Sequence, residues 1–510
     1  MRPLFRGAAV PGAARSRALV WPLLLAALGA LQTVAFVHTA AWPLPLLATA
    51  VLAAAVARAA PGRAALLGWA FGTGWLAAGT WWLFISMHRY GAIPAPLAAA
   101  AVGLLAAALS LYLALAMAAF ARWRTGRAAP DALLFGALWT MAELARGVLF
   151  TGFPWVASGY AQVDAPLAVL LPWVGVYGVG AVAAALAAAL AAGWPARVVA
   201  VAALGLAALL PAPDFTRAAG TLDVALLQPN VAQDDKFAAD RMPETLAWVA
   251  RALTTAEAPL VIAPETAVPL LPDQLEDFAP GYWAALVAHF TPPGRAALVG
   301  VPLGDFRVGY TNSVVGLSEA TAAQPYRYDK HHLVPFGEFI PPGFRWFTDA
   351  MNIPLGDFNR GPLVAPSFAA AGQRIAPNIC YEDLFGEELA RRFLDPATAP
   401  TMLANVSNIG WFGDTVAVPQ HLAISRVRSL ELQRPMLRAT NTGATAVVDH
   451  RGRVTAQLAP FTRDVLSAQA EGRDGVTPYA WWAARAGLWP LAVLAAAAVL
   501  WRAIVSGRRG

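Results

Sequence analysis

Apolar stretches long enough to cross a membrane dominate the first 212 residues of this 510-residue chain. A membrane-spanning helix needs about 20 predominantly apolar residues. Seven such stretches precede residue 215 and one lies near the C-terminus, at 18–37, 41–57, 64–86, 94–121, 131–149, 173–194, 196–212 and 487–504. The pattern predicts a polytopic α-helical membrane domain of about eight transmembrane helices, seven within 1–215 and one, with a short tail, within 484–510.

The hydropathy pattern changes at about Ala219. From there to about Pro478 the apolar runs are short and are separated by Pro and Gly. β-Rich runs such as TLDVALLQ alternate with helical patterns such as ETLAWVARALTT. Alternation of this kind is typical of one α/β domain with a buried core. Three predicted strands end directly on polar residues, and α/β folds usually place functional side chains at the carboxyl ends of strands. These polar residues are Glu265, Cys380 and the pair Ser407–Asn408.

Charge is distributed unevenly along the chain. The sequence is 58% hydrophobic and 13% charged, and only three of its 31 acidic residues precede residue 213. Arginines gather in alternate loops on one predicted side of the membrane: Arg2, Arg6, Arg15, Arg17, Arg58, Arg63, Arg122, Arg124, Arg127, Arg197, Arg502, Arg508 and Arg509. The positive-inside rule therefore predicts cytoplasmic termini and a 219–478 domain outside the cytoplasm, which in a bacterium means the periplasmic face of the inner membrane. Because these arginines set membrane orientation, the basic pI does not indicate a nucleic-acid partner.

Cys380, in the string NICYED, is the only cysteine of the chain. A lone thiol forms no internal disulfide, so its use is either core packing or chemistry. Two other segments favour chemistry, because APETAVP supplies the carboxylate of Glu265 and KHHLVPFGEF supplies the amine of Lys330. Together the three residues provide a base, a cation and a nucleophile. Lys236 is the only other lysine, and such scarcity favours a dedicated role for Lys330.

The inventory of other reactive groups disfavours rival functions. The seven histidines include no HExxH pair, and one cysteine cannot build a thiolate metal site, so we expect neither a metal nor a cofactor. A transporter with an external binding domain is disfavoured because the predicted spans hold almost no ionisable residues. A Cys–His dyad is an alternative that leaves Glu265 and Lys330 unexplained. Its candidate histidines are His331, His332 and His421.

Four motifs give the chain a family resemblance. In this order and spacing, APETAVP, DKHHLVPFGEF, NICYEDLF and SNIGWFGDT resemble the nitrilase superfamily of carbon–nitrogen hydrolases. With the apolar spans around them and the segments KHHLVPFGEFIP and ISRVRSLELQRPMLRATNTG, essentially the whole chain resembles the bacterial apolipoprotein N-acyltransferases. The resemblance implies a nitrilase-like αββα sandwich over 219–478 with a Glu265–Lys330–Cys380 triad.

The resemblance also implies a role for each site residue. Glu265 is expected to take the proton of the Cys380 thiol, and Lys330 is expected to bind the oxyanion together with the backbone N–H of Tyr381. Supporting roles around the triad are expected for Asn312, Glu338, Tyr381 and Glu382.

Three more residues are candidates for contact with the substrate. Trp411 and Phe412, in GWFGDT, are candidates for an acyl-chain path, with ordinary core packing as the alternative. Arg438, in LRATNTG, is a candidate for contact with a phosphate head group, with a structural salt bridge as the alternative.

The reaction that the resemblance implies is acyl transfer through a thioester. Cys380 would attack an ester of a phospholipid, with phosphatidylethanolamine as the expected donor. The acyl group would then pass to the N-terminal amine of S-diacylglyceryl-cysteine on an apolipoprotein, the last step of lipoprotein maturation. Both substrates are anchored in lipid, so the reaction needs a membrane-embedded enzyme. The alternative is a membrane-tethered carbon–nitrogen hydrolase, an amidase that uses water as the acceptor.

Overall fold

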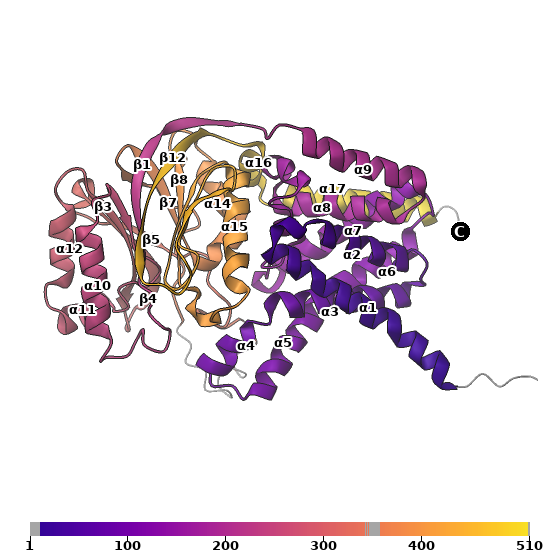
Figure 1. Cartoon of the computed structure of the whole chain (residues 1–510), viewed down its shortest axis with the longest axis horizontal. Helices are drawn as coiled ribbons and strands as arrows, with labels where there is room; N and C mark the ends of the chain where they lie inside the picture. Colours follow the sequence, from indigo (N-terminus) through magenta and orange to yellow (C-terminus); the bar gives the residue numbers. More distant parts are fainter. Residues whose placement is uncertain (1–10, 342, 344, 346–356, 508–510) are drawn as a thin grey trace, which may run out of the picture.

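The computed structural model describes residues 11–341, 343, 345 and 357–507. A bundle of long helices and a layered α/β domain lie side by side along the long axis of the molecule (Figure 1). Four arginines of the predicted charge asymmetry fall outside the described residues: Arg2, Arg6, Arg508 and Arg509.

The helices of the bundle follow the apolar stretches of the sequence. Within the described residues they are α1 (Pro11–Val37), α2 (Pro43–Val56), α3 (Pro61–Thr80), α4 (Leu83–Ile85), α5 (Ala95–Leu109), α6 (Leu111–Trp123), α7 (Ala128–Val148), α8 (Leu171–Ala191), α9 (Trp194–Leu209) and, near the C-terminus, α17 (Trp489–Gly507). Proline occupies the first turn of α2, α3, α5 and α9. Its fixed φ suits a helix start, and its missing N–H would have no partner there.

Six helical segments in the described part of the chain are both long and apolar enough to cross a membrane: Leu19–Val37, Thr39–Val56, Ala95–Trp123, Ala128–Thr151, Pro166–Ala191 and Trp489–Ser506. The sequence predicted two more spans, at 64–86 and 196–212. Both regions are helical, as α3 and α9. However, Arg63 and several glycines and threonines lower the mean hydropathy of α3, and α9 has only 16 residues. The predicted polytopic membrane domain is confirmed, with two segments that fall short of a full apolar span.

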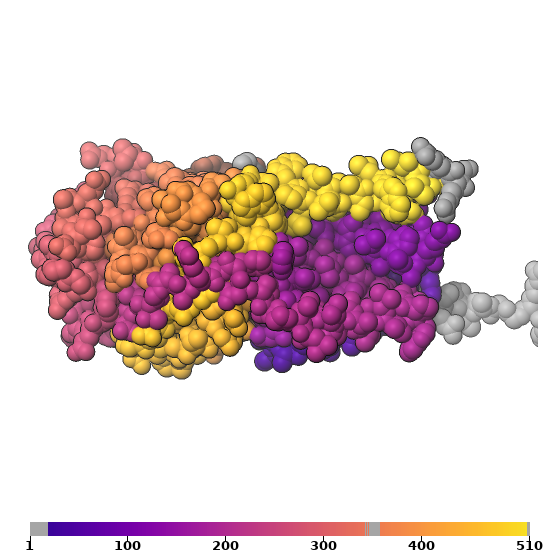
Figure 2. All heavy atoms as spheres, turned by 90° about the horizontal axis from the view of Figure 1, so that it is seen from above, coloured from indigo at the N-terminus to yellow at the C-terminus, as the bar shows by residue number. Residues whose placement is uncertain are grey.

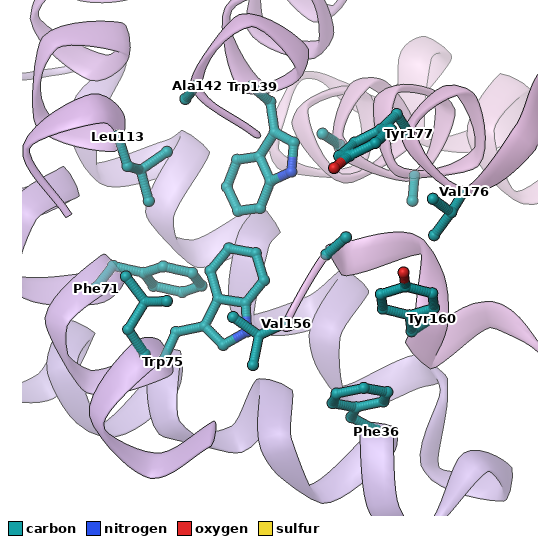
Figure 3. Close-up of a cluster of buried hydrophobic side chains, with 14 of the residues drawn as sticks. Phe36, Phe71, Trp75, Leu113, Trp139, Ala142, Val156, Tyr160, Val176 and Tyr177 are labelled. Carbon is teal, nitrogen blue, oxygen red and sulfur yellow. The ribbon is translucent and has the colours of Figure 1, made fainter. Parts of the chain in front are cut away.

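Aromatic side chains fill the centre of the bundle (Figure 3). Trp75 of α3 stacks on Trp139 of α7, and Phe36 of α1 stacks on Tyr160, with 5.5 Å between ring centroids in both pairs. Such pairs contribute roughly 0.5–1.5 kcal/mol beyond the area they bury. Because lipid tails are as apolar as the helices, close packing of this kind is what holds membrane helices together.

The arginine-rich loops meet at the end of the bundle that faces away from the α/β domain (Figure 1). Arg124, between α6 and α7, donates to the backbone oxygen of Ala59, between α2 and α3, at 3.3 Å. Arg502 of α17 donates to the backbone oxygen of Trp123 at 3.2 Å. The loops that the sequence assigns to the cytoplasm therefore lie together in space.

Two six-stranded sheets form the centre of the described α/β domain. The first, in the order β12-β1-β2-β3-β4-β5, contains β1 (Thr216–Gln228), β2 (Leu260–Ile262), β3 (Ala296–Asp305), β4 (Gly309–Ser318), β5 (Tyr326–Asp329) and β12 (Asp464–Gly475). The second, in the order β11-β10-β9-β8-β7-β6, contains β6 (Phe368–Ala370), β7 (Gln373–Ile379), β8 (Met402–Ser407), β9 (Met436–Thr440), β10 (Ala446–Val448) and β11 (Val454–Gln457). The neighbours β1-β2-β3 and β7-β8-β9 run parallel.

Helices cover the outer face of each sheet, which gives the four layers of an αββα sandwich (Figure 1). The first sheet is covered by α10 (Met242–Thr255), α11 (Pro272–Phe278) and α12 (Tyr282–Phe290), and the second by α14 (Gly386–Ala390), α15 (Ala417–Leu432) and α16 (Pro478–Ala486). Leu226, Ile262, Ile379 and Val406 belong to the apolar core between the sheets. The predicted sandwich fold is confirmed.

The helical layer on the second sheet faces the bundle. α15 packs against α8, and one apolar cluster runs from Phe36 of α1 to Val427 of α15. Seen from above, α17 lies along one side of the bundle and α9 along the other (Figure 2). Residues at the bundle side of the second sheet therefore lie close to the ends of the membrane helices.

Candidate active site

Glu265 lies in the turn that follows β2. Its Oε1 accepts hydrogen bonds from Asn312 Nδ2 at 2.7 Å and from Lys330 Nζ at 3.4 Å. Its Oε2 accepts from the backbone N–H of Asn408 at 2.8 Å, at the end of β8 in the other sheet. These contacts fix the orientation of the carboxylate between the ends of the two sheets.

Lys330 follows β5 directly and is almost completely buried. Its Nζ donates to Glu338 Oε1 at 2.9 Å as well as to Glu265. Asn312 Nδ2 contacts the same Glu338 oxygen at 2.8 Å. Burial by itself disfavours the ammonium, but the charges of Glu338 and Glu265 outweigh burial and raise the pKa of Lys330. Lys330 is therefore a fixed cation held between two carboxylates.

Cys380 begins a short helical turn (Cys380–Leu384) directly after β7, with a φ of +52°. A positive φ outside glycine costs on the order of 1 kcal/mol or more and needs support from its surroundings. The Cys380 carbonyl receives that support from Asn405 Nδ2 and from His421 Nε2, both at 3.3 Å. A sharp turn from strand to helix is a known way to present a nucleophile at the end of a sheet.

The electrostatic surroundings couple Cys380 to the other two residues of the predicted triad. Burial and the negative charge of Glu265 raise the pKa of the Cys380 thiol to about 12, while Lys330 acts in the opposite direction. The Cys380 thiol is thus protonated at neutral pH, and the predicted nucleophilic role would require its proton to leave as the new bond forms. The structure brings Glu265, Lys330 and Cys380 into one site.

Glu382 ties the Cys380 turn to the Lys330 segment. Its Oε2 accepts from the backbone N–H of Ile379 and its Oε1 accepts from the backbone N–H of His331, both at 2.7 Å. Ile379 precedes Cys380 and His331 follows Lys330. One buried carboxylate therefore connects the segment that carries the thiol with the segment that carries the ammonium, as the predicted supporting role of Glu382 requires.

Tyr381 links the same turn to the membrane bundle. Its hydroxyl donates to the backbone oxygen of Gly152 at 3.2 Å, and its ring belongs to the apolar cluster of the bundle. Its backbone N–H lies in the first turn of Cys380–Leu384, where N–H groups have no partner within the helix. This position suits the predicted donation to an oxyanion.

The two aromatic residues of GWFGDT have different surroundings. Phe412 packs against Trp82 and Trp155 of the bundle, with ring centroids 4.2 and 6.3 Å away. Trp411 meets the ring of Tyr90 at 5.5 Å and keeps 39% of its surface exposed. Phe412 is therefore partly buried against the bundle, which fits the core-packing alternative, and Trp411 is the more exposed of the two.

Arg438 is completely buried and pairs with Asp383 at 3.4 Å. It also donates to His421 Nδ1 at 3.2 Å and to Asn405 Oδ1 at 3.4 Å. These are the two side chains that donate to the Cys380 carbonyl. Its environment is the structural salt bridge, and a guanidinium enclosed in this way has no surface for a lipid head group. The structure therefore gives Arg438 contacts that support the Cys380 turn in place of the expected contact with a head group.

The histidines considered as partners of Cys380 make other contacts. Since Arg438 donates to Nδ1 of His421, the ring carries its proton on Nε2 and donates it to the Cys380 carbonyl. His331 Nδ1 lies 2.8 Å from the backbone oxygen of Gly361, and His332 Nδ1 lies 3.0 Å from Glu388. These contacts do not support a Cys–His dyad. No group of three His, Cys, Asp or Glu that could hold a metal ion occurs among the described residues.

Two buried residues of the site were not predicted from the sequence. Lys236 Nζ donates to the backbone oxygen of Glu265 at 3.2 Å, and Gln233 Oε1 accepts from Asn408 Nδ2 at 2.9 Å. The scarcity of lysine was a usable signal for Lys236. Nothing in the sequence pattern distinguished Gln233 from a surface residue.

Known proteins resemble both parts of the chain. Residues 28–189 match the family model described as apolipoprotein N-acyltransferase N-terminal domain, and residues 223–473 match that of carbon-nitrogen hydrolase. The chain is 59% identical over 452 residues to the apolipoprotein N-acyltransferase of Verminephrobacter eiseniae, covering 84% of each chain. The chain belongs to the apolipoprotein N-acyltransferase family. It is also 48% identical over 498 residues to the member from Ralstonia nicotianae, covering 94% of each chain, and 43% identical over 514 residues to that from Bordetella bronchiseptica, covering 90% of this chain and 93% of the relative.

Membership of the apolipoprotein N-acyltransferase family confirms the resemblance that the four motifs indicated. The first matched segment runs from α1 to α8, and the second runs from β1 to β12. Among solved structures, the carbon–nitrogen hydrolase from Helicobacter pylori G27 covers 54% of this chain and 94% of its own, with a TM-score of 0.36 and 16% identity. The family assignment rests on the sequence relatives.

Proposed function

We propose that this chain transfers a fatty acyl group from a phospholipid, through a thioester on Cys380, to the N-terminal amine of S-diacylglyceryl-cysteine on apolipoproteins. The observation that carries the proposal is the position of the lone thiol. Cys380 directly follows the parallel strand β7 and is coupled electrostatically to Glu265 and Lys330. Its neighbour Tyr381 donates to Gly152 of the membrane bundle at 3.2 Å. A nucleophile at that junction suits two substrates that are anchored in lipid.

The first half of the reaction loads the enzyme. Glu265 takes the proton of the Cys380 thiol while the sulfur attacks the ester carbonyl of the phospholipid, with phosphatidylethanolamine as the expected donor. The carbonyl oxygen becomes negatively charged in the tetrahedral intermediate, where Lys330 and the Tyr381 N–H stabilise it. When the intermediate collapses, the C–O bond breaks and Glu265 returns the proton to the departing lysophospholipid. An acyl thioester remains on Cys380.

The second half discharges the enzyme. The neutral amine of the diacylated apolipoprotein attacks the thioester carbonyl, and the same donors stabilise the new oxyanion. Glu265 accepts a proton from the amine nitrogen, the C–S bond breaks, and the thiol regains a proton. The products are an amide on the lipoprotein and the free enzyme. Neither half requires a metal or a cofactor.

Label transfer between the two substrates tests the proposal. Purified protein incubated with phospholipid that carries a labelled acyl chain should release lysophospholipid and hold label on the protein. Addition of a diacylated lipopeptide should move the label to the peptide amine. Slow loss to water and fast loss to the amine is the expected result. Rapid loss of the label to water, with none reaching the peptide, would favour the amidase alternative.

Membrane orientation follows from the arginine distribution and is also a proposal. We expect the 219–478 domain on the periplasmic face, because the arginine-rich loops lie at the opposite end of the bundle. A reporter that is active only in the periplasm should be active when fused near Gly475 and silent when fused near Arg124. A reporter that is silent near Gly475 and active near Arg124 would contradict this orientation. The phospholipid donor could then not come from the outer leaflet.

A further inference from the structure

Lys236 is a second buried ammonium that contacts the Glu265 turn. Only 4% of the Lys236 surface is exposed. Its Nζ donates to the backbone oxygen of Glu265 at 3.2 Å and to the hydroxyl of Thr266. Thr266 has a φ of +46°, a left-handed conformation that is unfavourable for a β-branched residue. The ammonium therefore holds a strained turn whose first residue is the predicted base.

This cation has no carboxylate partner within ion-pair distance among the described residues. Buried charges are normally paired, because desolvation of an unpaired ion is costly. Burial lowers the pKa of Lys236 to about 8, and the groups that oppose this effect are Glu265 and Cys380. The acidic groups that interact electrostatically with this ammonium are therefore the predicted base and the predicted nucleophile, and none of them is a structural acid.

The loop that carries Lys236 is held from two sides. Asn408 donates to Gln233 at 2.9 Å, and the backbone N–H of the same Asn408 donates to Glu265. On the other side, Asp234 pairs with Arg89 of the membrane bundle at 2.5 Å. An ammonium on a segment fixed in this way is preorganised, which is what a positioning role requires.

We propose that Lys236 is a positioning residue of the active site, which holds the Glu265–Thr266 turn and places a second positive charge beside the Glu265 backbone. The inference rests on the roles proposed above for Glu265 and Cys380. Lys330 contacts the carboxylate of Glu265, and Lys236 contacts its backbone oxygen. The two lysines of the chain would then serve one carboxylate.

The charges around Glu265 make the expected effect specific. Lys330 and Lys236 place positive charge beside Glu265, whereas Glu338, which shares Lys330 and Asn312 with it, places negative charge there. Asp234 and Asp235 on the Lys236 loop are exposed to solvent, which screens them. Removal of the Lys236 charge should therefore move the pH dependence of acyl-enzyme formation to higher pH.

The test is the pH dependence of acyl-enzyme formation with vesicles of phosphatidylethanolamine as the only substrate. Lys236→Met should lower the rate at neutral pH by roughly 10- to 100-fold and move the acidic limb of the profile upward by about one pH unit. Lys236→Gln, which keeps a hydrogen-bond donor without the charge, should recover part of the rate and leave the limb displaced. If Lys236→Met does not fold, the displacement of the acidic limb in Lys236→Gln tests the inference by itself.

A matched control removes an exposed cation just beyond the same loop. Arg241→Met should leave both the rate and the limb unchanged, since Arg241 is exposed and pairs only weakly with Asp240 at 3.7 Å. An acidic limb that stays in place in both Lys236 variants, or that Arg241→Met displaces equally, would overturn the inference. Failure of the unmodified protein to form any acyl-enzyme on Cys380 would instead overturn the proposed function.

Discussion

Cys380→Ala should take up no acyl group from phospholipid, and its transfer to a diacylated lipopeptide should fall by roughly 10⁴-fold or more. Without the sulfur there is no covalent intermediate, and the two substrates have no direct reaction path. Intact mass measurement after incubation with phospholipid alone should show one added acyl group on the unmodified protein and none on the variant. Neutral hydroxylamine should remove that group, because thioesters are more labile than oxygen esters.

The single cysteine makes this experiment selective. Any thiol-directed label reports on Cys380 alone, so alkylation and inactivation should proceed together. Alkylation should be slow at neutral pH and faster as pH rises, because burial and Glu265 raise the pKa of the thiol to about 12 and the thiolate is scarce below that value. Cys380→Ser should also fail to load appreciably, since a hydroxyl is far harder to deprotonate. Full transfer by Cys380→Ala would end the nucleophile hypothesis.

Lys330→Met should reduce acyl-enzyme formation by about 10³-fold or more. Removal of one oxyanion donor typically costs 10²–10³-fold. Here the substitution also leaves Glu265 and Glu338 facing each other across Asn312 without their shared cation. Two close carboxylates without a cation favour protonation of one of them, which impairs the base as well. Pre-steady-state measurement of lysophospholipid release would give the rate.

Stability should respond to the same substitution. Removal of one partner from a buried ion cluster typically costs about 3–5 kcal/mol, so the melting temperature of Lys330→Met in detergent should fall. The combination with Glu338→Gln should restore part of that stability and none of the rate, which separates folding from catalysis.

Lys330→Arg should also form the acyl-enzyme slowly, because a planar guanidinium does not replace a point charge in a tight site. Arg295→Met, which removes an exposed cation, is the matched control. Near-normal rates of acyl-enzyme formation in Lys330→Met or Lys330→Arg would show that Lys330 does not bind the oxyanion.

Hydropathy and charge patterns determined the plan of this protein from its sequence. A span depends on the composition of one continuous segment, so the membrane bundle was predictable even though α3 and α9 fall short as full spans. The sandwich was predictable from the alternation of strands and helices and from the four motifs. Cys380, Glu265 and Lys330 could be named as candidates because their residue types and motifs indicate the chemistry.

The tertiary structure decided how the polar residues around these three are used. Arg438 and Phe412 each had a ligand-binding and a packing interpretation, and the structure gives both the packing environment. A local pattern cannot decide such cases, because an arginine in a buried strand looks the same whether its partner is a lipid phosphate or an aspartate. The partner, Asp383, is 55 positions away in the chain.

Distance along the chain is the physical reason for the remaining differences. Glu382 meets the N–H of His331 over 51 positions, and Glu265 meets that of Asn408 over 143 positions. Lys236 contacts the Glu265 carbonyl over 29 positions, from a loop without regular structure. Residue type and periodicity by themselves indicated the candidate catalytic groups and the polytopic membrane domain. Only the folded chain, by bringing separate segments together, determined which buried donor serves which acceptor.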